Sequence, residues 1–175
     1  GDPRSEKMQK NLNLKVKFRQ SFRPFAPAVI EENLKEWFET NVPNSYMLLV
    51  SKVKSGKLLK NSIQSKGFDQ LNDKRSEIPA VTHVDNSARI QTVNEKTNKR
   101  FYNLLKEFKK ITNVPILINT SFNIRGEPIV SSVEDAFRCF MGTNLDILVC
   151  ENYVISKKDN QNQQDMNYKD KFKLD

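Results

Sequence analysis

The sequence has few of the residues that common phosphate-binding and nucleophile motifs require. Glycine occurs five times in 175 residues, and no GxxxxGK phosphate loop is present. No serine stands in the glycine-framed turn that presents a hydrolase nucleophile. Covalent catalysis therefore has little support, and positioning and electrostatic stabilisation of anionic substrates have more.

Histidine and cysteine are also scarce. His83 is the single histidine, which argues strongly against a zinc site, and we expect no metal ligands in the chain. Cys139 and Cys150 each lie in an apolar pattern without metal-type spacing. That placement favours buried, reduced thiols over a disulfide.

Long hydrophobic runs are absent. No apolar stretch approaches the roughly 20 residues needed to span a bilayer, and residues 1–13 lack the apolar core of a signal peptide. We therefore expect a cytoplasmic protein with no membrane contact. The 37% hydrophobic content of the chain still leaves room for the core of one domain.

Positive charge is plentiful by comparison. The net charge is +8, and the basic residues are concentrated in residues 1–24 and 52–75. Such basicity is compatible with binding of nucleic acid, with binding of anionic metabolites, or with a role in solubility alone. Net charge does not distinguish these explanations.

Helical and strand patterns alternate along the first half of the chain, which predicts a mixed α/β class. Residues 1–14 resemble an interdomain arm, and the basic–apolar alternation of residues 15–23 predicts a half-buried strand. After Pro24 and Pro27 we expect a helix. Its apolar stripe is Ile30, Leu34, Trp37 and Phe38. Further strands are expected at residues 46–50, 78–81 and 90–93, and residues 51–76 are expected to form a basic insertion loop on the surface.

The second half continues the alternation. A helix of about a dozen residues should bury one face, and a strand should follow at residues 114–118. That face comprises Phe101, Leu104, Leu105, Phe108 and Ile111. Residues 131–134 form a capping box for a further helix that Gly142 would end, and strands are expected at 145–150 and 153–155. The polar tail, 156–175, is predicted to be disordered.

Two polar clusters, at residues 82–89 and 119–128, follow predicted strands. Ligands of open α/β sheets gather at the carboxyl ends of strands, so the clusters favour a polar ligand with several oxygens. Ser121 and Asn123 flank Phe122 and could contact it, or could form a turn that satisfies its own backbone. His83 could act as a base, with Asp85 orienting it or pairing with Arg89, or could be a structural loop residue.

A cationic group precedes both clusters. Lys17 and Arg19 flank Phe18, and Arg23 follows four residues after Arg19. These side chains could form a patch suited to phosphate, with arginine offering a planar two-pronged contact. The alternative is the solvated face of an edge strand.

Five motifs, taken together, resemble the C-terminal domain of the carbamoyltransferase family that includes nodulation-factor and tobramycin enzymes. They are VKFR at 16–19 with FRPFAP at 22–27, IPAVTHVD at 78–85, ARIQTV at 88–93, NTSFN at 119–123 and GEPI at 126–129. The resemblance extends over roughly residues 2–155, and long motifs in series are specific.

The resemblance implies a YrdC-like fold, in which a twisted mixed sheet with flanking helices forms a single domain, here residues 15–155, around a positively charged cavity. It implies that the domain binds ATP and carbamoyl phosphate and makes carbamoyl adenylate, with release of pyrophosphate. A separate N-terminal domain of actin-like, metal-binding fold would pass the carbamoyl group to an acceptor hydroxyl.

The YrdC signature is a Lys-x-Arg pair with a later Ser-x-Asn, and Lys17, Arg19, Ser121 and Asn123 match both halves. The resemblance implies catalytic roles for Lys17, Arg23, Arg89 and Ser121, and binding of nucleotide or carbamoyl phosphate by Arg19, His83, Thr120 and Asn123. Mg²⁺ is expected to accompany ATP, although no carboxylate cluster identifies its ligands.

The chain departs from the family pattern in three places. Asn86-Ser87 replaces the usual Gly-Thr, the 51–76 segment is longer, and the acceptor-recognising domain is absent from these residues. One alternative is a threonylcarbamoyl-adenylate synthase of tRNA modification, which the motifs FRPFAP and HVD argue against. The other is a non-catalytic RNA-binding module, which the lack of exposed aromatic interleaving argues against.

Overall fold

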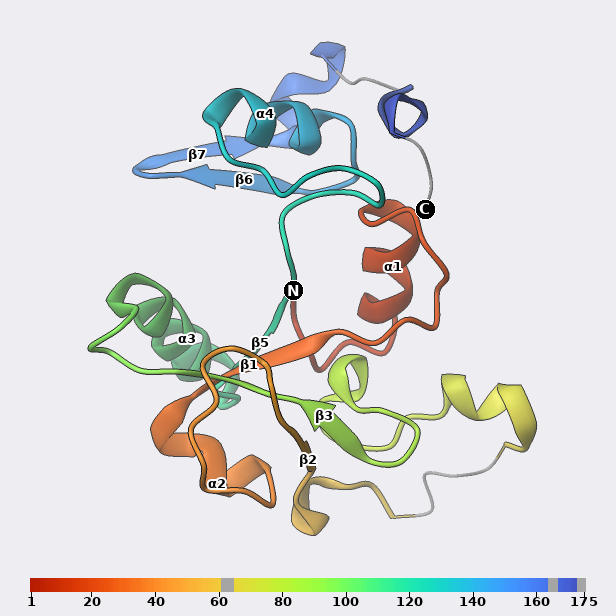
Figure 1. Ribbon diagram of the computed structural model, residues 1–175, viewed down its shortest axis with the longest axis vertical. Coiled ribbons are helices and arrows are strands. Elements are labelled where there is room, and N and C mark those ends of the chain that lie inside the picture. The colour runs from red at the N-terminus through yellow and green to blue at the C-terminus, as the bar shows by residue number, and fades with distance from the viewer. Residues whose placement is uncertain (61–64, 164–166, 173–175) are drawn as a thin grey trace. The chain divides into compact units, whose positions relative to one another are not determined.

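The computed structural model describes residues 1–60, 65–163 and 167–172 (Figure 1). Residues 1–9 and 24–120 pack as one compact unit, unit 1, and residues 10–23 and 121–175 as a second, unit 2. Helices and strands of both pairing directions occur, which confirms the predicted α/β class with a mixed sheet.

The centre of unit 1 is a three-stranded sheet in the order β4-β1-β5. Strand β1 (Ala26–Ile30) runs parallel to β4 (Gln91–Val93) and antiparallel to β5 (Ile116–Asn119). All five residues of β1 are buried, as expected of a central strand. The strands predicted at 90–93 and 114–118 are therefore confirmed within a few residues.

The helix predicted from Pro27 onward is wrong in its first part. Residues 26–30 form β1, and the helical segment begins only after it, with a 3₁₀ turn (Glu31–Asn33) and α2 (Leu34–Trp37). A fully buried strand shows no alternation, so its apolar run resembles the start of a helical stripe. Pairing of β1 with β4 starts at Ala28, so Pro27 lies where no N–H is needed for that ladder.

Helix α3 (Lys99–Thr112) packs against β1 and β5 and confirms the predicted helix (Figure 1). Asn98 caps its first turn by accepting from the Phe101 N–H, and Asn113, with φ of 62°, ends it. The predicted apolar face is only partly correct. Leu105 is buried, but Leu104 is 56% exposed and Ile111 is 84% exposed.

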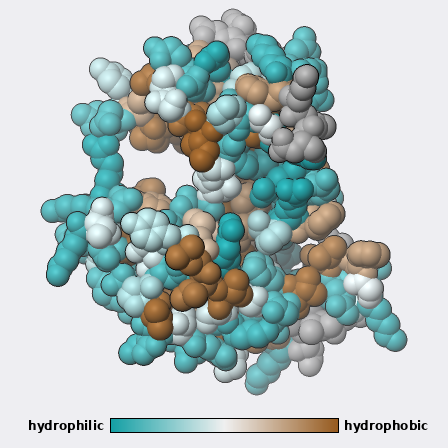
Figure 2. Space-filling view, in the orientation of Figure 1, coloured by the Kyte–Doolittle hydropathy of each residue, from teal (hydrophilic) through white to brown (hydrophobic). Residues whose placement is uncertain are grey.

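No strand forms at residues 46–49 or 78–81. Strand β2 (Val50–Lys52) begins later and pairs with β3 (Ser87–Arg89), and Pro79–Val81 is a buried 3₁₀ turn. The buried amide of Asn44 holds the segment before β2: it accepts from the Leu48 N–H and donates to the carbonyls of Leu49 and Ile90. Large apolar side chains are consequently fixed on the surface, where Figure 2 shows brown atoms over this segment.

The described part of the insertion, residues 51–60 and 65–76, is tied into unit 1 more firmly than a surface loop. Val53 and Arg75 are buried, and the Lys57 ammonium lies 4.2 Å from the centre of the Trp37 ring. The Arg75 guanidinium donates to the carbonyls of three residues, Gln70, Asp73 and Val84. Residues 61–64 lie outside the described residues.

Unit 2 packs helix α4 (Val133–Met141) on a hairpin of β6 (Ile147–Cys150) and β7 (Tyr153–Ser156). The Ser132 hydroxyl caps α4 by accepting from the Asp135 N–H, and Gly142 follows its last residue, so the predicted helix is confirmed. Cys139 on α4 is buried and Cys150 on β6 half-buried, and both are free thiols.

Residues 1–23 differ from the predicted arm and strand. Helix α1 (Met8–Lys15) occupies part of the expected arm, and no strand follows it. The chain instead turns at Phe18, whose φ of 48° is left-handed and unusual for a bulky residue. The alternation of basic and apolar residues therefore belongs to a turn.

The C-terminal segment also departs from the predicted disorder where it is described. Lys157–Gln163 and Tyr168–Lys171 form 3₁₀ turns, and Tyr168 is buried among residues of unit 2. The polar composition of this segment did not indicate that Tyr168 would anchor it. Residues 164–166 and 173–175, also predicted to be disordered, lie outside the described residues.

Candidate functional site

The turn after α1 is held by one buried amide. The Asn13 side chain donates to the carbonyls of Ser21 and Arg23, at 3.0 and 2.8 Å, and accepts from the Arg19 Nε at 2.6 Å. These bonds fix the turn against α1 and place its cations together. The left-handed backbone of Phe18 adds local strain of the kind found at ligand sites.

Lys17 is the buried cation of this turn, with 5% of its surface exposed. Its ammonium donates to the carbonyl and hydroxyl oxygens of Ser121, at 2.8 and 3.1 Å, and to the carbonyl and amide oxygens of Asn123, both at 2.7 Å. The Ser121 hydroxyl also donates to the Asn123 amide oxygen. Lys17 therefore joins the two halves of the predicted signature directly.

The environment of Lys17 changes its acidity. Burial lowers the pKa of Lys17 to about 8, and the Arg19 charge adds to the decrease, whereas the Glu127 carboxylate opposes it. The four oxygen atoms around the ammonium favour the protonated form. Lys17 is accordingly a cation at neutral pH that loses its charge at mildly alkaline pH.

A cavity of about 450 Å³, the cationic cavity, opens beside this network. It is lined by Lys17, Arg19, Arg23, Ser121, Asn123, Ile124, Arg125, Gly126, Glu127 and Pro128. Four of these side chains are cations and one is a carboxylate. Burial and the nearby Arg23 charge lower the pKa of Arg19, because cations held close together repel one another. An anion in the cavity would relieve this repulsion and accept charge-assisted hydrogen bonds.

Glu127 is the carboxylate of the cavity and was missed by the sequence reasoning. It accepts from the Ile124 N–H at 2.8 Å and from the Tyr168 hydroxyl, and the Asn123 amide donates to its carbonyl oxygen at 2.7 Å. The left-handed φ of 79° at Gly126 allows the turn between these residues. Arg125 was also missed, although it lies within the polar cluster; Asn13 had no signal in the sequence.

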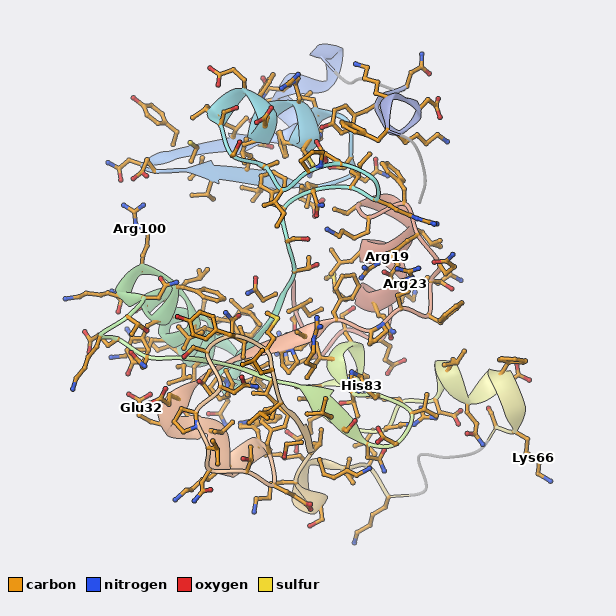
Figure 3. The ribbon with its side chains drawn as sticks, viewed as in Figure 1. Arg19, Arg23, Glu32, Lys66, His83 and Arg100 are labelled. Carbon is orange, nitrogen blue, oxygen red and sulfur yellow. The ribbon has the colours of Figure 1, made fainter. Side chains whose placement is uncertain are left out.

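The structure brings together Lys17, Arg19, Arg23, Ser121 and Asn123 in unit 2 (Figure 3 labels Arg19 and Arg23). The three other predicted residues, His83, Arg89 and Thr120, belong to unit 1. Arg89 is an exposed residue of β3, and Thr120 is the exposed residue that follows β5.

His83 is organised by its own loop. Its Nδ1 lies 3.1 Å from the Ser87 hydroxyl, and burial, aided by the Arg89 charge, lowers its pKa, so the imidazole is neutral at pH 7. Asp85 makes no direct bond to His83 or Arg89, but the Ser87 hydroxyl links it to His83. Its carboxylate accepts from the Ser87 hydroxyl and from Lys52, which hold its pKa at about 2.

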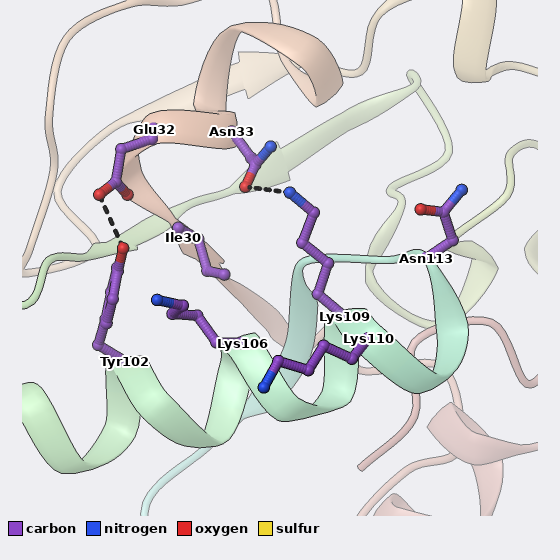
Figure 4. Close-up of a pocket in the computed structure, with 8 residues that line it drawn as sticks. All are labelled: Ile30, Glu32, Asn33, Tyr102, Lys106, Lys109, Lys110 and Asn113. Carbon is purple, nitrogen blue, oxygen red and sulfur yellow. Dashed lines mark hydrogen bonds between the residues drawn. The ribbon is translucent and has the colours of Figure 1, made fainter.

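A second basic pocket, the α3 pocket, lies in unit 1 and has a volume of about 540 Å³ (Figure 4). It is lined by Ile30, Glu32, Asn33, Tyr102, Lys106, Lys109, Lys110 and Asn113. Lys109 donates to the Asn33 amide oxygen, Lys110 pairs with Glu107, and the Tyr102 hydroxyl donates to Glu32. Lys106 and Lys110 are exposed, so this pocket is a solvated surface feature.

Neither a metal-binding cluster nor a membrane-spanning helix is found among the described residues. No group of three His, Cys, Asp or Glu side chains there is arranged to hold a metal ion. No helix in that part of the chain has the length and apolar character needed to cross a membrane.

Within this α/β fold, a buried lysine beside an arginine-lined cavity is an arrangement suited to anions. Comparison with known proteins identifies the family. The family model described as carbamoyltransferase C-terminus matches residues 1–157, and the chain therefore belongs to the carbamoyltransferase family.

Three relatives illustrate the extent of the match. The chain is 50% identical to the uncharacterized protein sll1178 of Synechocystis sp., covering 100% of the chain and 29% of that protein. It is 40% identical to the nodulation protein NolO of Bradyrhizobium diazoefficiens, covering 90% of the chain and 26% of that protein. It is 31% identical to the nodulation protein U of Rhizobium tropici, covering 88% and 23%. The chain thus spans about a quarter of the length of these relatives.

Proposed function

We propose that this chain is the carbamoyl-adenylate-forming domain of an O-carbamoyltransferase. Membership of the family supports a role in carbamoyl transfer. The observation that carries the finer proposal is the buried Lys17 ammonium, held by Ser121 and Asn123 beside the cationic cavity. ATP and carbamoyl phosphate are both polyanions, and this cavity offers the charge that they require.

The reaction assigned to the site has two balanced steps. Water attacks carbamoyl phosphate and releases inorganic phosphate and carbamate. A carbamate oxygen then bonds to the α-phosphorus of ATP, while the bond from that phosphorus to the β-phosphate oxygen breaks and pyrophosphate leaves. Phosphoryl transfer of this kind depends mainly on positioning and charge stabilisation, which agrees with the absence of a nucleophile motif.

Three cations of the cavity have a part in this chemistry. Arg19 and Arg23 would hold phosphate oxygens and stabilise the charge that moves onto the leaving pyrophosphate. Lys17, through Ser121 and Asn123, would orient the carbamate. Mg²⁺ bound to ATP would share the phosphate charge, and no residue of this chain is assigned to it.

The residues of unit 1 complete the proposed set. Arg89, from its motif position, would contact a phosphate of the substrates, Thr120 would neighbour the adenylate, and the neutral His83 would act as a polar binding group. Transfer of the carbamoyl group to an acceptor hydroxyl is proposed for a separate N-terminal domain, because the chain spans only a quarter of its relatives. A cytoplasmic location is part of the same proposal.

Exchange of labelled pyrophosphate into ATP tests the proposal. Exchange should require both the chain and carbamoyl phosphate, because only a reversible adenylate connects pyrophosphate to ATP. The chain alone should carbamoylate no sugar or aminoglycoside hydroxyl, and a carbamoylated acceptor would contradict the division of labour.

Two other outcomes would replace the proposal. Exchange that depends on threonine and bicarbonate instead of carbamoyl phosphate would indicate a threonylcarbamoyl-adenylate synthase. Steeply salt-dependent RNA binding without ATP binding would indicate an RNA-binding module.

A further inference from the structure

The C-terminal segment 167–172 lies beyond residues 1–157, which the family model matches, yet it packs beside the candidate site. Tyr168 is buried with Ile124 and Cys139, and its hydroxyl donates to the Glu127 carboxylate. Burial and this bond raise the pKa of Tyr168 well above its usual value, so the hydroxyl keeps its proton. The segment is thus anchored to a residue that lines the cationic cavity.

Gly142 and Phe172 complete the anchor. A Cβ atom at Gly142 would collide with the Tyr168 ring, so the end of α4 is shaped to receive this aromatic side chain. The Phe172 ring meets the Tyr168 ring edge-on, with their centres 5.3 Å apart. Tyr168 therefore determines where the half-buried Phe172 lies.

A pocket of about 610 Å³, the aromatic pocket, is enclosed in part by this segment. It is lined by Leu14, Phe18, Arg19, Ile124, Arg125, Lys169, Asp170 and Phe172. Arg19, Ile124 and Arg125 line the cationic cavity as well, so the two spaces adjoin. The difference between them is chemical, because the aromatic pocket has two phenylalanine rings and the cationic cavity has none.

We propose that the aromatic pocket is the subsite for the base and ribose of a nucleotide whose phosphates occupy the cationic cavity, with the segment 167–172 as one of its walls. This inference rests on the proposed function. A planar base stacks favourably on an aromatic ring, and Phe18 and Phe172 both line the pocket. The Asp170 carboxylate can accept from an exocyclic amine, and the shared Arg19 and Arg125 lie where base and phosphates would join.

Calorimetry with two probes, ATP and inorganic tripolyphosphate, separates the subsite from the phosphate site. Phe172→Ala should weaken ATP binding about tenfold, since stacking on an aromatic ring contributes roughly that much, and should leave tripolyphosphate binding within about twofold. Phe172→Leu, which keeps most of the packing volume, should lose ATP affinity in the same selective way. Phe68→Ala removes the same side chain from a position that is 90% exposed in unit 1 and should change neither affinity.

Three results would overturn the inference: unchanged ATP affinity in Phe172→Ala, equal loss of both ligands in Phe172→Leu, or equal loss in the Phe68 control. Its failure is distinguishable from that of the proposed function. If the unaltered chain binds tripolyphosphate but not ATP, or neither, the proposed function fails with it; if the unaltered chain binds ATP and only the selective loss is missing, the subsite alone is wrong.

Discussion

The cationic cavity of unit 2 and the α3 pocket of unit 1 are both lined by several cations, but they are built differently. In the cationic cavity Lys17 is buried and has four oxygen partners, and the amide of Asn13 fixes the turn that carries it. In the α3 pocket Lys106 and Lys110 are exposed side chains of one helix. Charge count alone does not distinguish the two pockets.

The cost of burial does distinguish them. Burying a cation is unfavourable unless polar partners compensate. A buried lysine therefore occurs only where the fold supplies hydrogen-bond acceptors for it, whereas an exposed lysine needs none. Exposed lysines keep their hydration and contribute little when they pair with a neighbouring carboxylate. We therefore expect anions to bind more tightly in the cationic cavity, whose lysine is buried and hydrogen-bonded, than in the α3 pocket.

The largest effect should come from Lys17→Met, which keeps the length of the side chain but removes its charge. We expect affinity for ATP and carbamoyl phosphate to fall about a hundredfold, because the cavity loses its buried charge and Ser121 and Asn123 lose the ammonium that holds them. Calorimetry measures this, and Lys10→Met on α1 is the matched control. A loss of similar size in the control would remove the distinction between buried and exposed lysines.

Arg89 provides an intermediate case, since it is exposed like the α3 lysines but lies in a family motif. Arg89→Ala should weaken the binding of ATP or carbamoyl phosphate about tenfold, the contribution of one charge-assisted contact, without unfolding unit 1. Arg100→Ala on α3 serves as the control. Unchanged affinity for both ligands would exclude Arg89 from the site.

The pH dependence of anion affinity should also differ between the two pockets. The pKa of Lys17 is about 8, so anion affinity should fall about eightfold between pH 7.5 and 9 as the ammonium loses its proton. Cys139, whose pKa burial raises to about 12, does not titrate in this range. Lys17→Met should show no such decrease, and a decrease in that variant would assign the effect to another group.

The same titration of Lys17 should raise the stability of the fold as the pH increases, whereas it lowers the anion affinity. The folded-state pKa of Lys17 lies below its unfolded value of 10.5, so the unfolded chain binds more protons between about pH 8 and 10.5. The contribution of Lys17 to the free energy of unfolding therefore rises with pH across this window. Urea unfolding at pH 8 and 10, compared with Lys17→Met, measures that rise, and equal slopes in the two proteins would contradict it.

The smallest effect is expected in the α3 pocket. Replacing Lys106, Lys109 and Lys110 together by alanine should change affinity for ATP by less than about twofold, because Lys106 and Lys110 are exposed and Lys109 is only half-buried. Calorimetry measures the affinity, and the melting temperature shows whether α3 is preserved. A tenfold loss would show that exposed charge suffices for binding and that burial of the lysine is not what distinguishes the two pockets.

The sequence predicted which residues form the candidate site better than how the fold brings them together. The motifs identified Lys17, Ser121 and Asn123 as one signature, and the structure joins them by hydrogen bonds. The turn that makes this contact could not be predicted, because positive φ at a phenylalanine has no sequence signal. Glu127 and Tyr168 could not be predicted for a related reason. They matter because they hydrogen-bond to each other, and they lie 41 positions apart in the chain.

The elements show the same division. Helices α3 and α4 were predicted because caps and periodicity are local, whereas β1 was not, because its fully buried pattern depends on β4 and β5. Asn44 similarly prevents a strand at residues 46–49 through bonds to Ile90. Local signals determine single elements, and contacts distant in sequence determine the connections between them.

The four oxygens around Lys17 have a consequence for the chemical survival of the site. An unprotonated lysine amine is a nucleophile, and a carbamoyl donor held beside it would modify it. At neutral pH the ammonium that donates to these oxygens has no lone pair, but with a pKa of about 8 it forms the reactive amine in mildly alkaline solution. The network that positions Lys17 thus protects it from the reactive group that the site is proposed to handle only below that pH.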